Sequence, residues 1–504
     1  MNHESEQISI LGKDAQQVSA EYLRDVAHTK RFLERWTMDP SFRDRYTEDP
    51  GAAIASLGLA LTAEQLDPLL SYSLAAEITE RLAAGEQDAC PESVKRYRAF
   101  INEKKRHRAT TRNAGEPADP RLAAWRARQV ERCRGELGPA RAEAIVHAPV
   151  TFELSKGCTV GCWFCGVAAP DFDHNLEYTE QNAQLWTGVL EAVRDVVGEP
   201  ASQGFLYWAT DPLDNPDYEG YLAEFHRIFD RCPQTTTAIA HKDVERTRRL
   251  LELGASLGSY VDRFSIISLK FLDIVHEAFT PEEMLRVECV AQNKESSDKH
   301  LKSNSGRARQ FAHGKRAAEL AGEQTSSTIA CVSGFLFNMV ERSVKLITPC
   351  NSSDRWPLGY WIVDEGTFDT AEELRALLEK IIANNCRRYL GVDDTVRLRN
   401  DVRISVEDDR VLATSLGIAT TLGPLPDPQD VARWLGEGTL TVEQIATLRE
   451  ERSGVSPVET MVLLDQLFVR GLTNEEPAEP PASATPAPRG RARKVSVALQ
   501  SSPR

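Results

Sequence analysis

Three closely spaced cysteines constrain this chain more than any other feature. Cys158, Cys162 and Cys165 follow the pattern Cys-x3-Cys-x2-Cys in the stretch CTVGCWFC. The chain has ten cysteines in 504 residues, so three within eight positions are hard to ascribe to chance burial of free thiols. Three thiolates on one loop can hold three irons of a [4Fe–4S] cluster, whereas most such clusters have four cysteine ligands. The spacing therefore predicts a cluster with one iron open to a small molecule.

Zinc is the main alternative for this loop. A zinc site requires a second Cys or His pair at ligand spacing, and the nearest histidine, His174, lacks a companion. The pattern favours the cluster.

Composition limits the classes of function. The formal net charge is −15, from 75 acidic and 60 basic side chains, which argues against a general nucleic-acid binder. No apolar run reaches membrane-spanning length, and the N-terminal residues lack the pattern of a signal peptide. We therefore expect a cytoplasmic protein with no membrane partner, in a reducing compartment where disulfides are rare.

Residues 1–148 read as a helical N-terminal region. Pro40 and Pro50 each follow an aspartate, which is typical of helix starts. The run KRYRAFINEKKRHR at 95–108 is strongly basic, and either an acidic ligand or, more commonly, a solvated helix face explains such a run.

From residue 150 the pattern becomes α/β. Six β-like runs, at 150–154, 204–209, 236–240, 263–269, 285–291 and 327–335, alternate with helical segments. Repeated βα units imply a parallel sheet with right-handed crossovers, and in closed barrels the active site lies at the C-terminal ends of the strands. The cysteine loop follows the first run and falls on that face. A polar insertion at 293–326 precedes the sixth run, and 338–348 reads as a strand hairpinned to it.

The C-terminal part forms another unit. Strand-like runs at 395–399, 402–406 and 411–414 precede three helical segments at 428–436, 441–452 and 457–470. Residues 474–504 are rich in Pro, Ala, Glu and Ser, a composition that predicts disorder.

The cysteine loop resembles the signature loop of the radical S-adenosylmethionine (SAM) enzymes. The resemblance implies a partial (β/α)6 barrel over 149–390, SAM on the open iron, and an external electron donor of the flavodoxin or ferredoxin type. By position it assigns cofactor contacts to Phe164, Thr210, Asp211, Lys242 and Ser268. Thr210 and Asp211 stand where that family usually has Gly-Gly-Glu, so the sequence departs from its pattern there.

A second stretch narrows the resemblance. The motifs WFCG, ATDPLDNPDY, QNKES and TPCNSSDRWPLGY are similar to the radical SAM peptide epimerases, which install D-residues in proteusin-type precursors. That resemblance implies a lone thiol that returns a hydrogen atom to a peptide α-carbon. Cys350, in an active-site extension at 336–365, is the predicted donor, and Cys331 is the alternative.

The terminal regions resemble peptide-recognition elements. Residues 393–473 resemble the winged-helix, PqqD-like domain that binds leader peptides, and 27–75 is similar to the helical part of nitrile-hydratase-like leaders. No paired cysteines follow the loop, so one [4Fe–4S] cluster is predicted. The partner is then a precursor peptide with its leader.

Two other functions stay open on the sequence. A radical SAM maturase of this kind can instead cross-link or methylate its peptide. A non-enzymatic iron–sulfur or zinc sensor with a DNA-binding winged helix is the third hypothesis, which the acidic net charge disfavours.

Overall fold

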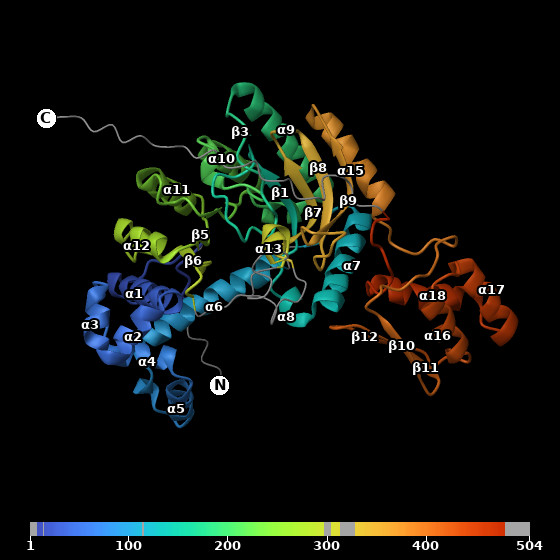
Figure 1. Cartoon of the computed structure of the whole chain (residues 1–504), viewed down its shortest axis with the longest axis horizontal. Coiled ribbons are helices and arrows are strands. Elements are labelled where there is room, and N and C mark those ends of the chain that lie inside the picture. The colour runs from blue at the N-terminus through green and yellow to red at the C-terminus, as the bar shows by residue number, and fades with distance from the viewer. Residues whose placement is uncertain (1–7, 14, 113–114, 297–303, 313–327, 479–504) are drawn as a thin grey trace.

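The structure is a computed structural model that describes residues 8–13, 15–112, 115–296, 304–312 and 328–478. It is a mixed α/β fold with a helical region at one end and a smaller α/β module at the other (Figure 1). Among the described residues, no helix combines the length and the apolar character that crossing a lipid bilayer requires.

In the described part of the N-terminal region, eight helices and one short 3-10 turn precede the sheet. The Asp-Pro pairs start helices as predicted: Asp39 caps α2 and Asp49 caps α3, each with proline in the first turn. The elements are α1 (Ala20–Met38), α2 (Pro40–Glu48), α3 (Pro50–Ser56), α4 (Ala63–Leu70), α5 (Tyr72–Ala83), η1 (Gln87–Ala89), α6 (Glu92–Arg112), α7 (Pro120–Leu137) and α8 (Pro139–Ala142).

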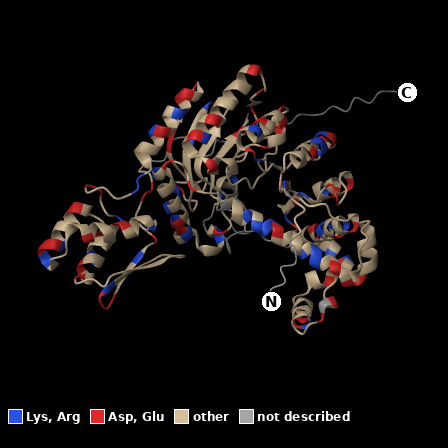
Figure 2. Cartoon of the chain, turned by 180° about the vertical axis from the view of Figure 1, so that it is seen from behind, with Lys and Arg blue, Asp and Glu red and all other residues tan. Residues whose placement is uncertain are grey.

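The basic run lies on α6, and several of its charges are paired within the protein. Arg96 contacts Glu21 and Asp25, and Lys104 contacts Glu288 on a distant strand. Figure 2 colours the Lys and Arg positions blue, and several of them follow one another along this helix. The structure thus gives part of this run a role in packing α6 against the rest of the chain.

The central strands of the described residues fall into two groups. The first group is the parallel set β4 (Thr236–Thr237), β5 (Asp262–Ile266) and β6 (Val287–Ala291). The second has β1 (Ala148–Glu153) parallel to β7 (Val332–Asn338), followed by antiparallel β8 (Ser343–Pro349) and β9 (Tyr360–Thr367). The predicted second strand, 204–209, forms only one bridge, between Phe205 and Thr151.

The predicted sixth strand is β7. It begins at 332 rather than 327, and it pairs with β1 in a sheet separate from β4, β5 and β6. That the strands form the predicted partial barrel stays a prediction. Most of the predicted insertion, 297–303 and 313–326, lies outside the described residues.

Helices cover one face of the sheet. Phe152 of β1 stacks on Phe337 of β7 and meets the edge of Trp186, so these rings form the centre of the main core. The elements between the strands are the short β2 (Ser155–Lys156) and β3 (His174–Asn175), η2 (Glu199–Gln203), η3 (Pro212–Asp214), α9 (Glu180–Val197), α10 (Tyr218–Phe229), α11 (Val244–Ser256), α12 (Leu269–Ala278), α13 (Gly306–Ala312) and α15 (Ala371–Asn385).

The C-terminal module has its own core of buried apolar side chains. Its sheet is β10 (Arg403–Glu407), β11 (Arg410–Thr414) and β12 (Ala419–Leu422), and its helices are α16 (Pro428–Glu437), α17 (Val442–Ser453) and α18 (Pro457–Val469). The predicted strand at 395–399 makes only isolated bridges, and β12 was not predicted.

The predicted disordered tail begins later than residue 474. Residues 474–478 are described and lie against α7, where Arg128 donates two hydrogen bonds to Glu475 at 2.7 and 2.8 Å. The rest of that prediction, 479–504, lies outside the described residues.

Candidate functional site

The cysteine loop is closed at its base by short backbone pairings. β2 pairs with β3, and the Cys158 amide donates to the Pro170 carbonyl at 3.0 Å. Gly157 makes this closure fit, because its φ is +82° and a β-carbon there would lie 2.2 Å from the Asp171 carbonyl oxygen. The loop therefore leaves the end of β1 in a fixed direction.

The three thiols are partly exposed and none forms a disulfide. The Cys162 thiol donates a hydrogen bond to Cys165, which lowers the pKa of Cys165 and raises that of Cys162. The Ala169 amide also points at the Cys165 sulfur, at 3.3 Å. Burial raises the pKa of Cys158 to about 12. Three thiols on one loop, with a backbone N–H directed at a sulfur, are a donor set that fits an iron–sulfur cluster.

The polar insertion contributes a cation to this loop. The Arg307 amide donates to the Cys165 carbonyl at 2.9 Å, and its Nη2 donates to the Ala169 carbonyl at 2.9 Å. Arg307 is 8% exposed, and its Nε and Nη1 have no hydrogen-bond partner among the described residues. Buried, unsatisfied donors beside thiols indicate room for an anionic group. The sequence offered no signal for this contact.

Two of the predicted cofactor residues lie near the loop. Lys242 Nζ donates to the Thr159 hydroxyl at 3.2 Å, and Thr159 is also held by Asp214 through its amide and hydroxyl. Asp211 is buried and accepts from the Thr237 hydroxyl and the Ala238 amide, both at 2.7 Å. Burial raises the pKa of Asp211 to about 6.

The remaining predicted cofactor residues, Ser268, Phe164 and Thr210, have different contacts within the fold. Ser268 caps α12 by accepting from the Phe271 amide at 3.1 Å, so one lone pair of its hydroxyl is used in the fold. Phe164 meets Trp163 edge to face, with ring centroids 5.5 Å apart. Thr210 precedes Asp211 and is partly buried.

Glu153 is a candidate residue that the sequence did not reveal. It ends β1, accepts from the Ala209 amide at 2.7 Å and from the Asn338 side chain at 3.0 Å, and is 8% exposed. Burial raises its pKa to about 7, so its carboxyl changes charge near neutral pH. The sequence signal that could have identified Glu153 is its place as an acidic residue at the end of a mostly apolar strand, just before the cysteines.

Cys350 is a buried thiol in the turn that follows β8. It is 1% exposed and belongs to an apolar cluster that includes Ala168, with Val167 packed against it. Burial raises its pKa well above the ordinary thiol value, and Cys331, which packs against the same cluster, has a pKa raised to about 11. Both thiols are therefore neutral at physiological pH.

A groove of about 670 Å³ lies on the C-terminal module. It runs along β10, whose other edge pairs with β11, and is closed by the end of α16. Its lining includes Arg397, Ile404, Arg433 and Glu437. An unpaired strand edge beside a groove is able to bind an extended peptide by backbone pairing.

Comparison with known proteins gives one relative of matching length. The uncharacterized protein y4wI of Sinorhizobium fredii is 37% identical over 464 residues, which span 90% of this chain and 88% of that protein. No family model matches the sequence. Among solved structures, BtrN in complex with AdoMet and 2-DOIA aligns over 39% of this chain and 71% of its own, at 13% identity and a TM-score of 0.27. That score is too low to establish a shared fold.

Proposed function

This chain belongs to the family of the y4wI protein, and we propose that it is a radical SAM enzyme that epimerises L-residues to D-residues in a ribosomally made precursor peptide. The observation that carries the proposal is a pair of features. Three thiols gather on the loop after β1, and a fourth thiol, Cys350, is buried in the apolar cluster that also contains Ala168, three residues after Cys165.

The residues of the loop suit a cluster with one open iron. Cys158, Cys162 and Cys165 would be its ligands, and the unsatisfied N–H groups of Arg307 would face its negative charge. When bound and reduced, the cluster with SAM supplies a 5′-deoxyadenosyl radical. Phe164, Thr210, Asp211, Lys242 and Ser268 remain the proposed SAM contacts, and Ser268 keeps one lone pair free for this role.

Cys350 is suited to return a hydrogen atom. Loss of the α-hydrogen from an L-residue leaves a planar carbon radical, and an S–H hydrogen delivered to the opposite face gives the D-residue. The donor must be a thiol and not a thiolate, and burial keeps Cys350 protonated. The same burial excludes bulk water from the sulfur.

The groove along β10 supports peptide recognition. We assign it to the leader of the precursor, which would add to the sheet at the β10 edge while its core reaches the barrel. A cytoplasmic flavodoxin or ferredoxin would supply electrons. This assignment implies a catalytic barrel at 149–390 and a recognition module at 393–473.

The test is turnover of the cognate precursor in D2O. Each inverted residue should gain one deuteron at its α-carbon, and the product made in H2O should keep its mass. Cys350→Ala should abolish inversion while 5′-deoxyadenosine still forms, and Cys386→Ala, at an equally buried thiol, should leave inversion intact. Unlabelled product would contradict the proposal, and a mass change of lost hydrogens or an added methyl group would establish cross-linking or methylation instead.

A further inference from the structure

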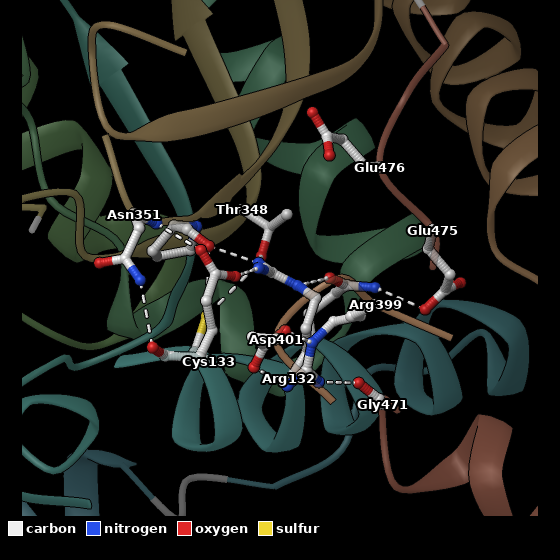
Figure 3. A network of polar contacts seen from close by, with 12 residues as sticks. Arg132, Cys133, Thr348, Asn351, Arg399, Asp401, Gly471, Glu475 and Glu476 are labelled. Atoms are coloured by element: carbon white, nitrogen blue, oxygen red, sulfur yellow. Dashed lines mark hydrogen bonds and ion pairs between the residues drawn. The ribbon is translucent and has the colours of Figure 1, made fainter. Parts of the chain in front are cut away.

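Helix α7 holds the turn that contains Cys350 from both sides. Arg132 donates to the Thr348 hydroxyl at 3.2 Å and also to the Pro349 carbonyl. Glu136, one helical turn later, accepts from the Asn351 amide at 2.6 Å. The residues before and after Cys350 are thus tied to the same helix (Figure 3).

Between these two anchors lies a second buried thiol, Cys133. Its Sγ donates to the Pro349 carbonyl at 3.3 Å, and that carbonyl belongs to the peptide bond that joins Pro349 to Cys350. Standard peptide dimensions then place the Cys350 Cα within roughly 6 Å of the Cys133 sulfur. An S–S bond is about 2.05 Å long, so rotation of the Cys133 side chain and a small movement of the Cys350 turn would bring the two sulfurs together.

The surroundings of Cys133 suit it to chemistry with Cys350 rather than with solvent. Cys133 is fully buried and Cys350 is 1% exposed. Arg132 Nη2 lies 3.5 Å from the Cys133 sulfur, so negative charge that develops on sulfur has a cation beside it. The Glu136 carboxylate, which is bonded to Arg132, is a nearby proton acceptor.

We propose that Cys133 is the redox partner of Cys350, a role that rests on the hydrogen-donor function proposed above. After Cys350 gives up its hydrogen atom, its sulfur radical bonds to the Cys133 sulfur. Cys133 loses its proton to Glu136, and the remaining electron would go to a one-electron acceptor of the iron–sulfur type, which Cys158, Cys162 and Cys165 would hold. The products are a Cys133–Cys350 disulfide, one proton and one electron. A dithiol reductant then returns two electrons and two protons and restores both thiols.

The pairing also identifies which neighbour reacts. Cys331 packs against Cys133 and against the cluster that contains Cys350, so it is the competing thiol. Cys133 also makes a polar contact to the Cys350 turn, which favours Cys133 as the partner.

The experiment oxidises the full-length protein with diamide, which needs neither SAM nor peptide. The sample is then alkylated, digested without reduction and analysed by mass spectrometry. We expect a linked pair of peptides that contain Cys133 and Cys350, removed by dithiothreitol and absent from Cys133→Ser, and Cys386 should stay unlinked. A Cys350 that remains fully alkylated after prolonged oxidation, or that links only to Cys331, would overturn the proposal. The Cys133–Cys350 cross-link is measured in the wild-type protein, so it can be tested even if a variant fails to fold. The cross-link also forms without SAM or peptide, so it is tested separately from the proposed epimerase activity.

Discussion

Replacement of Gly157 by alanine should prevent the cysteine loop from closing. An added β-carbon would lie 2.2 Å from the Asp171 carbonyl oxygen, 2.7 Å from its carbon and 2.9 Å from the Phe172 Cα. All three are backbone atoms, so no side-chain rotation relieves the clash. The base of the loop must open, and the hydrogen bond from the Cys158 amide to Pro170 is lost.

The cost can be worked from these contacts. A non-glycine residue at positive φ costs about 1–2 kcal/mol. Loss of the Cys158–Pro170 bond and of the adjacent β2–β3 pairing adds about 0.5–1.5 kcal/mol for each hydrogen bond. For two lost hydrogen bonds the sum is about 2–5 kcal/mol, which lowers the population of the closed loop by a factor of roughly 30 to 5,000 at 1.36 kcal/mol per factor of ten.

The assay is iron and sulfide content per chain after anaerobic reconstitution. Gly157→Ala should retain little iron, whereas the matched control Gly58→Ala should bind as much as the wild type. Gly58 also has positive φ, at +65°, but a β-carbon there meets nothing within 4 Å, so the control carries the backbone strain without the clash. Equal iron content in the two variants would refute the reasoning.

Three further predictions concern single side chains. Arg307→Gln removes a buried cation from the cysteine loop. The reduction potential of the cluster, measured by EPR redox titration, should therefore become more negative. An unchanged potential would show that the Arg307 charge does not act on the cluster. Glu153 has a folded pKa of about 7, above its unfolded value, so its contribution to stability is complete at low pH and is lost as pH rises through about 7. Glu153→Gln should therefore have a higher Tm than the wild type at pH 8 but not at pH 4. The gain in unfolding free energy at pH 8 should be up to about 3 kcal/mol. A difference that does not vary with pH would argue against the raised pKa of Glu153. Glu475→Gln leaves buried Arg128 without its carboxylate and should lower the unfolding free energy by about 2–4 kcal/mol. The control Glu451→Gln, at an exposed position, should lower it little. Equal Tm values for the two variants would show that residues 474–478 do not stabilise the fold.

Local sequence signals predicted local structure well. Asp39 and Asp49 start helices because a short carboxylate accepts the first amide of a helix and proline fits its first turn. The α/β alternation and the place of the cysteine loop after the first strand also follow from local patterns. Assignment of Cys158, Cys162 and Cys165 as ligands, and of Cys350 as donor, stays a prediction.

Features that depend on distant parts of the chain were not predictable. The pairing of β7 with β1 joins residues nearly two hundred positions apart, and hydrophobic periodicity does not encode such partners. The same holds for Arg307 at the cysteine loop and for Glu475 on Arg128, because composition marks both segments only as polar. The segment 204–209 looks β-like from its apolar residues, yet side-chain bonds such as Asp211 to Thr237 and Ala238 replace regular pairing just after it.

The central claim is that the cysteine loop supports reductive cleavage of SAM. The direct measurement is 5′-deoxyadenosine formed by the anaerobically reconstituted protein with SAM and dithionite. The account predicts about four irons per chain, formation of 5′-deoxyadenosine by the wild type, and none by a variant with Cys158, Cys162 and Cys165 all replaced by alanine. Zinc in place of iron, or an iron-loaded protein that leaves SAM intact under these conditions, would contradict it.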